Sequence, residues 1–399
     1  MSAHYSPILI IGAGPAGLAT AASLKQKGMK SLILEHGEQV APSWQGHYER
    51  LKLHTDKAHS GLPGTPWPKS APRYPTRQQV VDYLTNYAAE HELQVVFQQT
   101  VVRAERDLDG HGWVVQTQNN SYQCDTLIVA SGYNRNPNRP QWPNQSSYGG
   151  VIVHSSDYFN GKPYRGQRAL VVGLGNSGGE IAIDLHEHGA QVSMAVRSAV
   201  NVIPKEIFGI PFLTFGISQQ KLPPRLADAL NAPLTRWLVG DLTALGLKRP
   251  AHGPVTQIRE MARVPFIDTG TIGLMRAGHV AVRPGISQFT PKGVVFTDGR
   301  EEAFDAIVLA TGYRAGLDKW LHLKPGVLSE DGAPKTSGGA TPGEPGLYFC
   351  GYHVSATGML REIGLEATRI AAHVATDSTK HGTKHGTKHG TTNAAKHAA

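Results

Sequence analysis

Two glycine-rich turns are the residues of this chain with the clearest chemical meaning. The first reads GAGPAG at 12–17 and the second GLGNSG at 173–178, and each stands between an apolar run and a helix-like run. Such a turn presents backbone N–H groups and the positive end of a helix dipole to a pyrophosphate. The sequence therefore predicts two dinucleotide sites. Their candidate residues are Gly12, Gly14, Pro15, Ala16 and Gly17 in the first turn and Gly173, Gly175, Asn176, Ser177 and Gly178 in the second.

The residue at the end of the next strand distinguishes the two sites. Counting 23 residues from the first glycine leads to Glu35 in the first copy and to Val196 in the second, which Arg197 and Ser198 follow. A carboxylate there accepts hydrogen bonds from an unmodified ribose, whereas an arginine pairs with a 2′-phosphate. The first site is thus predicted to hold FAD or NAD and the second NADP, although a unit without the acid could also accept either nicotinamide cofactor. Together they indicate a flavin reduced by NADPH.

A third pattern lies between the two turns. Tyr148, Gly150, His154 and Tyr158 are spaced as aromatic-x-Gly-xxx-His-xxx-Tyr, and by spacing alone this is typical of a core histidine beside a turn. The pattern resembles the FxGxxxHxxxY fingerprint of flavin-containing monooxygenases, with Tyr148 in place of the first phenylalanine. Related Baeyer–Villiger enzymes carry Trp where this chain has Tyr158, so the resemblance favours the former group.

Over residues 7 to 375 the chain resembles the YUCCA-type branch of these class B flavin-dependent monooxygenases, which convert indole-3-pyruvate into indole-3-acetate. The segments that carry the resemblance are RLKLHTDK at 50–57, YPTRQQVVDYL at 74–84, VVGLGNSGGE at 171–180, LGLKRPAHGP at 245–254 and FDAIVLATGY at 304–313. The loop after Tyr352 departs from the family's arginine- and glycine-rich run and reads HVSATGMLREI, which leaves the substrate open.

The resemblance implies an FAD-dependent NADPH monooxygenase that acts on a small organic substrate with O2 through a flavin C4a-(hydro)peroxide. Oxidative decarboxylation of a 2-oxo acid such as indole-3-pyruvate is one outcome of this chemistry. N- or S-oxygenation of amines or thioethers and Baeyer–Villiger oxidation are alternatives. A flavin-dependent reductase and a non-catalytic flavoprotein are competing classes, and the absence of CxxC argues against a disulfide reductase.

The family pattern also indicates which side chains lie at the reacting centre. Trp44 and His54 fall in the segment expected to face the flavin, and His54 stands where animal-type members place an asparagine. His54, His154 and Tyr158 are the candidates for catalysis, although we expect the latter two to position the linker between the modules and not to transfer protons.

A 2-oxo acid would also need a cation for its carboxylate. Lys52, Lys205 and Arg361 are the candidates for this cation.

The elements that position these residues form two similar units. Residues 8–11 and 31–35 are predicted strands around a helix that Pro15 opens and Gly28 closes; residues 169–172 and 191–196 flank a helix at 177–188 in the same layout. DTLIVASGY at 125–133 recurs as DAIVLATGY at 305–313, each a buried strand that ends in a small-Gly turn. Gly132, Gly312 and Gly351 follow such strands and are candidates for cofactor contact.

These patterns predict an α/β fold with two Rossmann-like dinucleotide-binding domains, in which doubly wound sheets are accompanied by short β-meanders. Residues 1–163 and 318–378 would form a discontinuous FAD-binding domain, and 164–317 an inserted NADPH-binding domain. Residues 208–247 are expected to be an amphipathic helical insert that lines a substrate pocket, lies at a membrane surface or forms a packing or dimer surface. The KHGT-repeat tail at 379–399 lacks apolar residues and is predicted to be disordered.

Composition agrees with a globular enzyme. The chain has 399 residues, 45 glycines and a formal net charge of +8, and removing the four lysines of residues 380–399 leaves +4. This weak and scattered charge argues against nucleic acid as a partner. Cys124 and Cys350 have no metal or CxxC spacing and are expected to be core thiols, which fits a cytoplasmic protein with no metal site and no transmembrane segment.

Overall fold

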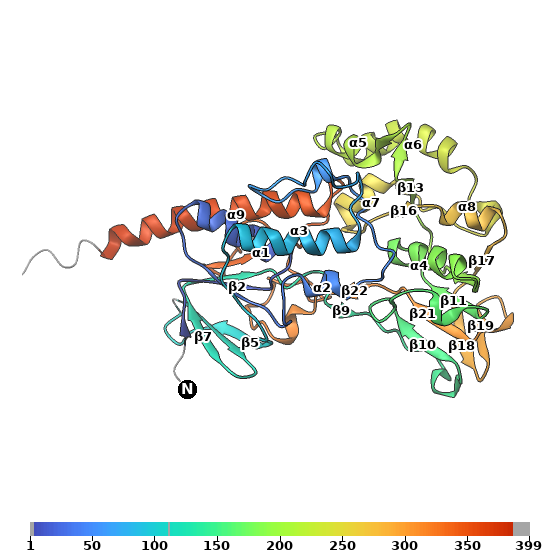
Figure 1. Cartoon of the computed structure of the whole chain (residues 1–399), viewed down its shortest axis with the longest axis horizontal. Helices are drawn as coiled ribbons and strands as arrows, with labels where there is room; N and C mark the ends of the chain where they lie inside the picture. The colour runs from blue at the N-terminus through green and yellow to red at the C-terminus, as the bar shows by residue number, and fades with distance from the viewer. Residues whose placement is uncertain (1–3, 111, 386–399) are drawn as a thin grey trace, which may run out of the picture.

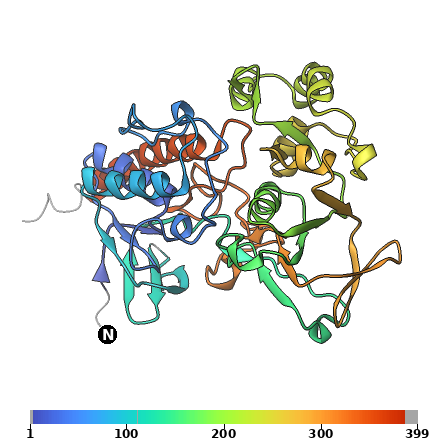
Figure 2. The same ribbon diagram turned by 45° about the vertical axis from the view of Figure 1, so that its right-hand side comes forward.

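Two five-stranded parallel sheets form the centres of two lobes that lie side by side (Figures 1 and 2). The structure is a computed structural model that describes residues 4–110 and 112–385, with side chains as far as residue 377. Each sheet has helices on one face and a small sheet on the other. The predicted fold class, two Rossmann-like units with meanders, is confirmed.

The first lobe is built on the strand order β23-β8-β2-β3-β4. Its strands are β2 (Ile8–Ile11), β3 (Leu32–Leu34), β4 (Val95–Val96), β8 (Thr126–Val129) and β23 (Leu347–Phe349). Alternate residues of β2 face opposite layers, as strand geometry requires. Ile8 and Ile10 pack with helices α1 (Pro15–Gln26), α3 (Arg77–Glu90) and α9 (Met359–His385). Leu9 and Ile11 pack toward a sheet formed by β1 (His4–Tyr5), β7 (Ser121–Cys124), β6 (Trp113–Thr117) and β5 (Val101–Arg106).

The second lobe repeats this layering with the strand order β10-β21-β11-β12-β17. Its strands are β10 (Val151–His154), β11 (Arg168–Val172), β12 (Gln191–Ala195), β17 (Val280–Arg283) and β21 (Ala306–Leu309). Ala169 and Val171 of β11 pack toward α4 (Asn176–Glu187) and α8 (Thr271–Arg276). Leu170 and Val172 pack toward a meander of β18 (Ile286–Thr290), β19 (Gly293–Phe296) and β20 (Glu301–Ala303).

Shorter elements connect the lobes and build the upper part of the second one (Figure 1). β9 (Asn136–Pro137) pairs with β22 (Tyr313–Arg314) where the chain crosses between the lobes. The predicted insert at 208–247 contains helices α5 (Phe212–Ser218) and α6 (Pro224–Val239), so its helical character is confirmed. The remaining elements are α2 (Pro42–Gln45), α7 (Pro254–Met261), β13 (Val202–Pro204), β14 (Glu206–Ile207), β15 (Ile210–Pro211), β16 (Phe266–Asp268) and 3-10 turns at Lys57–His59, Gln145–Ser147, Lys162–Tyr164, Thr243–Leu245 and Leu317–Lys319.

Two sequence-based expectations need correction. Residues 1–163 were expected to belong to the FAD-binding domain, but β10 pairs with β21 in the second sheet, ahead of the expected boundary at residue 164. The tail was predicted to be disordered from residue 379, but α9 continues to His385, and the rest of the predicted tail lies outside the described residues.

Both cysteines are free and buried, as expected. A capping box of Thr76 and Gln79 is present at the start of α3. None of the helices in the described ranges is both long enough and apolar enough to cross a bilayer.

Candidate active site

The first glycine turn has a separate steric reason for each glycine. Gly12 has φ +106°, and a Cβ there would lie 2.6 Å from the carbonyl oxygen of Ala130. A Cβ on Gly17 would lie 1.9 Å from the oxygen of Gly12, so only glycine lets α1 approach the strand. By contrast, a Cβ on Gly14 would have no neighbour within 4 Å. Gly14 thus borders open space at the N-terminus of α1, where no side chain caps the helix, as a bound pyrophosphate requires.

The second turn repeats this geometry closely. A Cβ on Gly173, which has φ +107°, would lie 2.6 Å from the oxygen of Ala310, and one on Gly178 would lie 2.1 Å from the oxygen of Gly173. A Cβ on Gly175 would again meet nothing within 4 Å. Asn176, the first residue of α4, accepts a hydrogen bond at Oδ1 from the backbone N–H of Ile267 at 2.8 Å. Both turns therefore fit a dinucleotide in the same way.

The glycines after the echoed strands also leave space open. Gly132 and Gly312 have φ +89° and +82°, and a Cβ on either would meet nothing within 4 Å. Gly351, with φ +88°, lies against α1, where its Cβ would be 3.0 Å from that of Ala16. Gly132 and Gly351 line the large cavity described below, together with Pro15.

Glu35 lies at the end of β3 as an ionised, hydrogen-bonded group. Its Oε2 accepts from the backbone N–H of Ala13 at 2.7 Å, and its Oε1 accepts from that of Gly37 at 2.9 Å and lies 2.6 Å from His36 Nδ1. Burial opposes ionisation, but these hydrogen bonds outweigh it and hold the pKa of Glu35 below its ordinary value. A carboxylate at the edge of the cavity fits the hydroxyl groups of an unmodified ribose.

Arg197 lies at the corresponding edge of the second lobe. Gly12 donates its N–H to Leu34, just before Glu35, and Gly173 likewise donates to Ala195 at 2.9 Å, two residues before Arg197. Arg197 and Ser198 are exposed, and Arg197 forms no ion pair within the described part of the chain. The guanidinium is thus free to pair with a phosphate.

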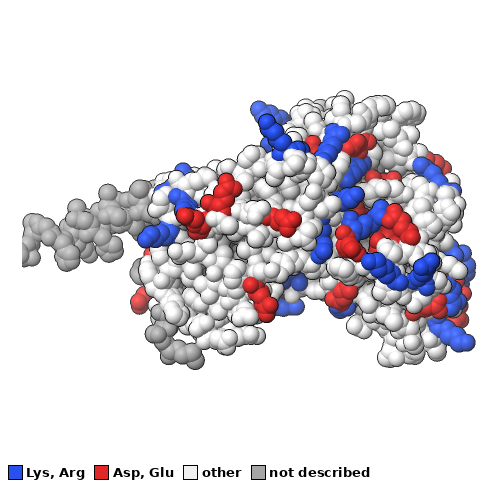
Figure 3. All heavy atoms as spheres, viewed as in Figure 1, with Lys and Arg blue, Asp and Glu red and all other residues white. Residues whose placement is uncertain are grey.

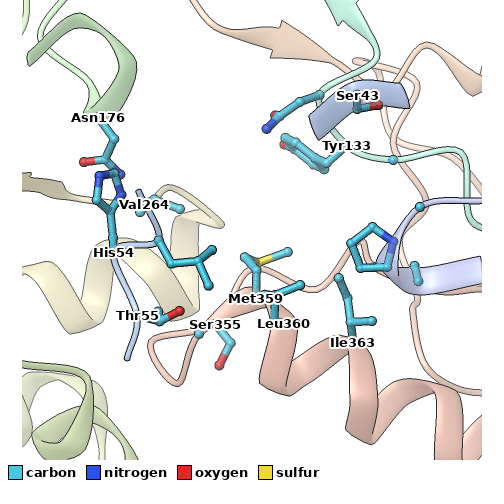
Figure 4. A pocket seen from close by; sticks show the side chains of 18 of the residues that line it. Ser43, His54, Thr55, Tyr133, Asn176, Val264, Ser355, Met359, Leu360 and Ile363 are labelled. Atoms are coloured by element: carbon cyan, nitrogen blue, oxygen red, sulfur yellow. The ribbon is translucent and has the colours of Figure 1, made fainter. Parts of the chain in front are cut away.

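A cavity of about 480 Å³ connects the two lobes. In Figure 4, Asn176 and His54 lie on one side and Ser43, Tyr133 and Ile363 on the other, with Met359 and Leu360 of α9 between them. The wall also includes Ser177, Trp44 of α2, and Phe212 and Leu213 of the insert. The insert therefore lines the cavity, one of the roles considered for it. Ser355, Ala356 and Gly358, from the loop that departs from the family pattern, line the cavity too.

His54 joins the two lobes within this wall. Its Nε2 lies 3.0 Å from Oε1 of Glu180 on α4, and both side chains are largely buried. The second carboxylate oxygen of Glu180 is buried without a hydrogen-bond partner. The pair ties the segment expected at the flavin to the helix that begins at the second glycine turn.

His154 and Tyr158, the other candidates for catalysis, lie away from the cavity lining. His154 is buried; its Nδ1 accepts from the N–H of Ser156 at 3.1 Å, so the proton is on Nε2, which lies 3.1 Å from the oxygen of Gly312. Burial lowers the pKa of His154 and keeps the ring neutral. Tyr158 is buried and donates to Asp184 on α4 at 2.5 Å. These contacts do not support a direct catalytic role and agree with the expected positioning of the linker.

The three candidate cations are separated by the fold. Lys205 lines the cavity, whereas Lys52 is exposed and is not part of the cavity lining, and Arg361 pairs with Thr357 and Glu362. Lys205 is therefore the candidate that can reach a ligand in this cavity.

On the face seen in Figure 3, acidic and basic side chains intermingle, in agreement with the scattered charge noted in the sequence.

Sequence reasoning missed Glu180 and Tyr48 as members of the site. Tyr48 is buried in the cavity wall and hydrogen-bonds Ser177. One signal for Glu180 was present, because a carboxylate stood between a glycine pair and apolar residues on a helix expected to be buried. Tyr48 had no such signal.

Comparison with known proteins extends these observations. Residues 9–205 match the family described as pyridine nucleotide-disulphide oxidoreductase. The chain is 39% identical over 356 residues to the probable indole-3-pyruvate monooxygenase YUCCA3 of Arabidopsis thaliana, covering 86% of this chain and 81% of that protein. It is 38% identical over 384 residues to the indole-3-pyruvate monooxygenase YUCCA8 of Oryza sativa subsp. indica, covering 92% and 90%. The structure of a flavin-containing monooxygenase from Stenotrophomonas maltophilia shares the fold, with a TM-score of 0.69 at 23% identity over 95% of this chain and 99% of that one.

Proposed function

The chain belongs to the YUCCA-type branch of the class B flavin-dependent monooxygenases, and from this membership we propose that it converts indole-3-pyruvate, or a similar aromatic 2-oxo acid, into the acid one carbon shorter. That it is an FAD- and NADPH-dependent monooxygenase follows from the family. The observation that carries the substrate proposal is the cavity between two dinucleotide turns, which combines an apolar wall with the cation of Lys205.

We assign the first lobe to FAD and the second to NADPH. Gly12, Gly14, Gly17 and Glu35 would hold the FAD pyrophosphate and ribose. Gly173, Gly175, Gly178 and Arg197 would hold NADPH. The open space beside Gly14 and Gly175 supports this assignment, because a backbone without a side chain there can contact phosphate oxygens.

The cofactor carries the redox chemistry, and the protein positions the cofactor and substrate and keeps water out of the site. Bound FAD would supply transfer of two electrons from NADPH to O2. His54 and Glu180 would hold the two lobes in register at the cavity, while Trp44, Met359 and Leu360 would exclude water from it.

The proposed reaction balances without a further reactant. The bond between the carbonyl carbon and the carboxylate breaks and CO2 leaves. One atom of O2 enters the new carboxylate and the other becomes water, while NADPH and a proton become NADP⁺. The stoichiometry therefore requires no co-reactant beyond NADPH, a proton and O2.

Coupling of NADPH use to product formation tests the proposal. Purified holoenzyme with indole-3-pyruvate should consume NADPH and O2 and form indole-3-acetate and CO2 in equal amounts, with little H2O2. Turnover of a 2-oxo acid with a phenyl group would show whether the enzyme accepts an aromatic ring other than indole. A thioether and an amine serve as representatives of the competing substrate classes. Coupled turnover of the thioether or amine together with only H2O2 from the 2-oxo acids would reject the proposal.

We further propose that the enzyme works in the cytoplasm, which the two buried free thiols support. A homodimer is a second proposal of this kind. The exposed Phe208 and Trp237 of the insert, whose rings lie 6.4 Å apart, support such a contact. Sedimentation of the holoenzyme would test it.

A further inference from the structure

Lys205 is a cavity-lining cation without an anionic partner. It lies in the turn between β13 and β14, and its Nζ is 3.8 Å from the centroid of the Tyr74 ring. Within the described residues, its ammonium group makes no ion pair and no hydrogen bond. A partly buried ammonium with three unused donors is suited to bind an anion that enters from outside.

The acids nearest to Lys205 are already engaged. Oε1 of Glu206 accepts from the Tyr74 hydroxyl at 2.6 Å and lies 3.2 Å from Nη1 of Arg73. Oε1 of Glu180 lies 3.0 Å from Nε2 of His54, and neither oxygen of Glu180 forms an ion pair or hydrogen bond with Lys205 in the described residues. The Tyr74 contact to Glu206 also fixes the aromatic ring under the ammonium, so Lys205 is held in place by a cation–π contact and not by a carboxylate.

The environment of Lys205 favours capture of a negative charge. Burial lowers the pKa of Lys205 and outweighs the opposing charges of Glu180 and Glu206, while the like charge of Lys52 adds to the lowering. The charged ammonium is thus less well compensated than on an open surface. A carboxylate beside it would restore this loss and would gain from the lower local dielectric.

The other cations at the cavity are arranged differently. Arg259 donates to the carbonyl oxygens of Leu222 and Gln219 at 2.6 and 3.2 Å. Arg135 follows Gly132 in the first lobe and lies over the Trp320 ring, at the end assigned to FAD.

The wall around the remaining space is largely apolar. It includes Phe212, Leu213, Val264, Pro265, Met359 and Leu360. Val264, Met359 and Leu360 lie around the same hollow as His54 in Figure 4. One cation in such a wall matches a ligand with an apolar aromatic body and one carboxylate.

We infer that Lys205 binds the carboxylate of the substrate and thereby sets the preference of this enzyme for acids over neutral and cationic compounds. This inference rests on the proposed function, because it takes the substrate to be a 2-oxo acid. Lys205 is a binding and specificity residue here, not an acid or a base in the reaction.

Equilibrium binding of two unreactive ligands separates this role from a structural one. Indole-3-propionate and its amide differ in charge but share the indole body. In equilibrium dialysis with oxidised holoenzyme, Lys205→Gln should weaken binding of the acid about 10- to 100-fold, as expected for loss of a hydrogen bond to a charged group, and leave the amide unchanged. Lys205→Arg should retain most of the affinity for the acid, and Lys52→Gln, which removes a nearby cation outside the cavity, should retain both affinities.

The possible results test the inference and the proposed function separately. Unchanged binding of the acid by Lys205→Gln, or equal loss of acid and amide, would overturn the inference. If the wild-type enzyme binds the acid through Lys205 but does not convert indole-3-pyruvate, the proposed function fails, while Lys205 remains a carboxylate-binding residue. If it converts indole-3-pyruvate and Lys205→Gln does so with the same KM, the inference fails and the function stands.

Discussion

Two single variants of the second glycine turn, Gly175→Ala and Gly178→Ala, should distinguish an effect on cofactor binding from an effect on stability. A Cβ on Gly178 would lie 2.1 Å from the backbone oxygen of Gly173, and neither backbone can move without displacing α4 from its strand. Overpacking of this kind costs about 1–3 kcal/mol or more, which for a module of this size lowers Tm by about 2–4 °C per kcal/mol. A Cβ on Gly175 would meet nothing within 4 Å, and its φ of −112° suits alanine. Gly175→Ala should therefore change stability by less than about 1 kcal/mol.

NADPH binding should respond most strongly to Gly175→Ala, the variant that is expected to change stability least. The methyl group of Gly175→Ala would occupy the space where phosphate must approach the N-terminus of α4, so we expect KM for NADPH to rise about 10-fold or more, equivalent to about 1.4 kcal/mol. The FAD content of the purified protein should remain normal, because the first turn is untouched. Thermal unfolding, the flavin absorbance of the purified protein and NADPH kinetics measure the three quantities. A wild-type KM for NADPH in Gly175→Ala would refute the assignment of this turn, as would destabilisation equal to that of Gly178→Ala.

Three further predictions concern charged groups. Arg197→Ala should raise KM for NADPH by about 10- to 100-fold while KM for NADH stays constant, and an unchanged ratio of the two would reject the 2′-phosphate contact. Glu35→Ala should yield protein with less bound FAD, measured by flavin absorbance, because the ribose loses its acceptor; full occupancy would contradict this. For Lys205 the sign follows from its lowered pKa: the charge is present below the folded pKa and is lost as pH rises through it, at lower pH than for an ordinary lysine. KM for a 2-oxo acid should therefore rise on the alkaline side, and Lys205→Arg should remove that rise. The charged groups nearest to Lys205 that act on this titration are Glu180, Glu206 and Lys52.

Local sterics made the cofactor turns predictable. Positive φ at Gly12 and Gly173 and the close approach of each third glycine are requirements of the turn itself, so they are encoded within a few residues. The end of the following strand was predictable for the same reason, because β3 and β12 each begin soon after the glycine that ends a helix. The order of FAD and NADPH sites was inferred from the residues at these strand ends, Glu35 and Arg197.

Long-range pairing explains what the sequence did not indicate. β10 is a four-residue strand in a segment rich in Pro, Asn and Gly, and its partner β21 pairs Val151 with Ala306. The local sequence of β10 does not distinguish it from a short extended segment within a loop. The contact of His54 with Glu180 spans 126 positions and depends on how the lobes meet. Selection of Lys205 over Lys52 likewise required the turn between β13 and β14 to face the cavity.

The fate of labelled oxygen tests the central claim most directly. The holoenzyme should be given NADPH, indole-3-pyruvate and ¹⁸O2, and the products analysed by mass spectrometry. We predict one ¹⁸O atom in the carboxylate of indole-3-acetate, one CO2 released and one NADPH consumed per product. The same incubation with added catalase excludes a reaction in solution, because peroxide released from ¹⁸O2 would also carry the label into the product. Labelled indole-3-acetate should persist with catalase present. Its loss, while NADPH and O2 are still consumed, would contradict the account, because the enzyme would then be an NADPH oxidase whose released peroxide decarboxylates the substrate in solution.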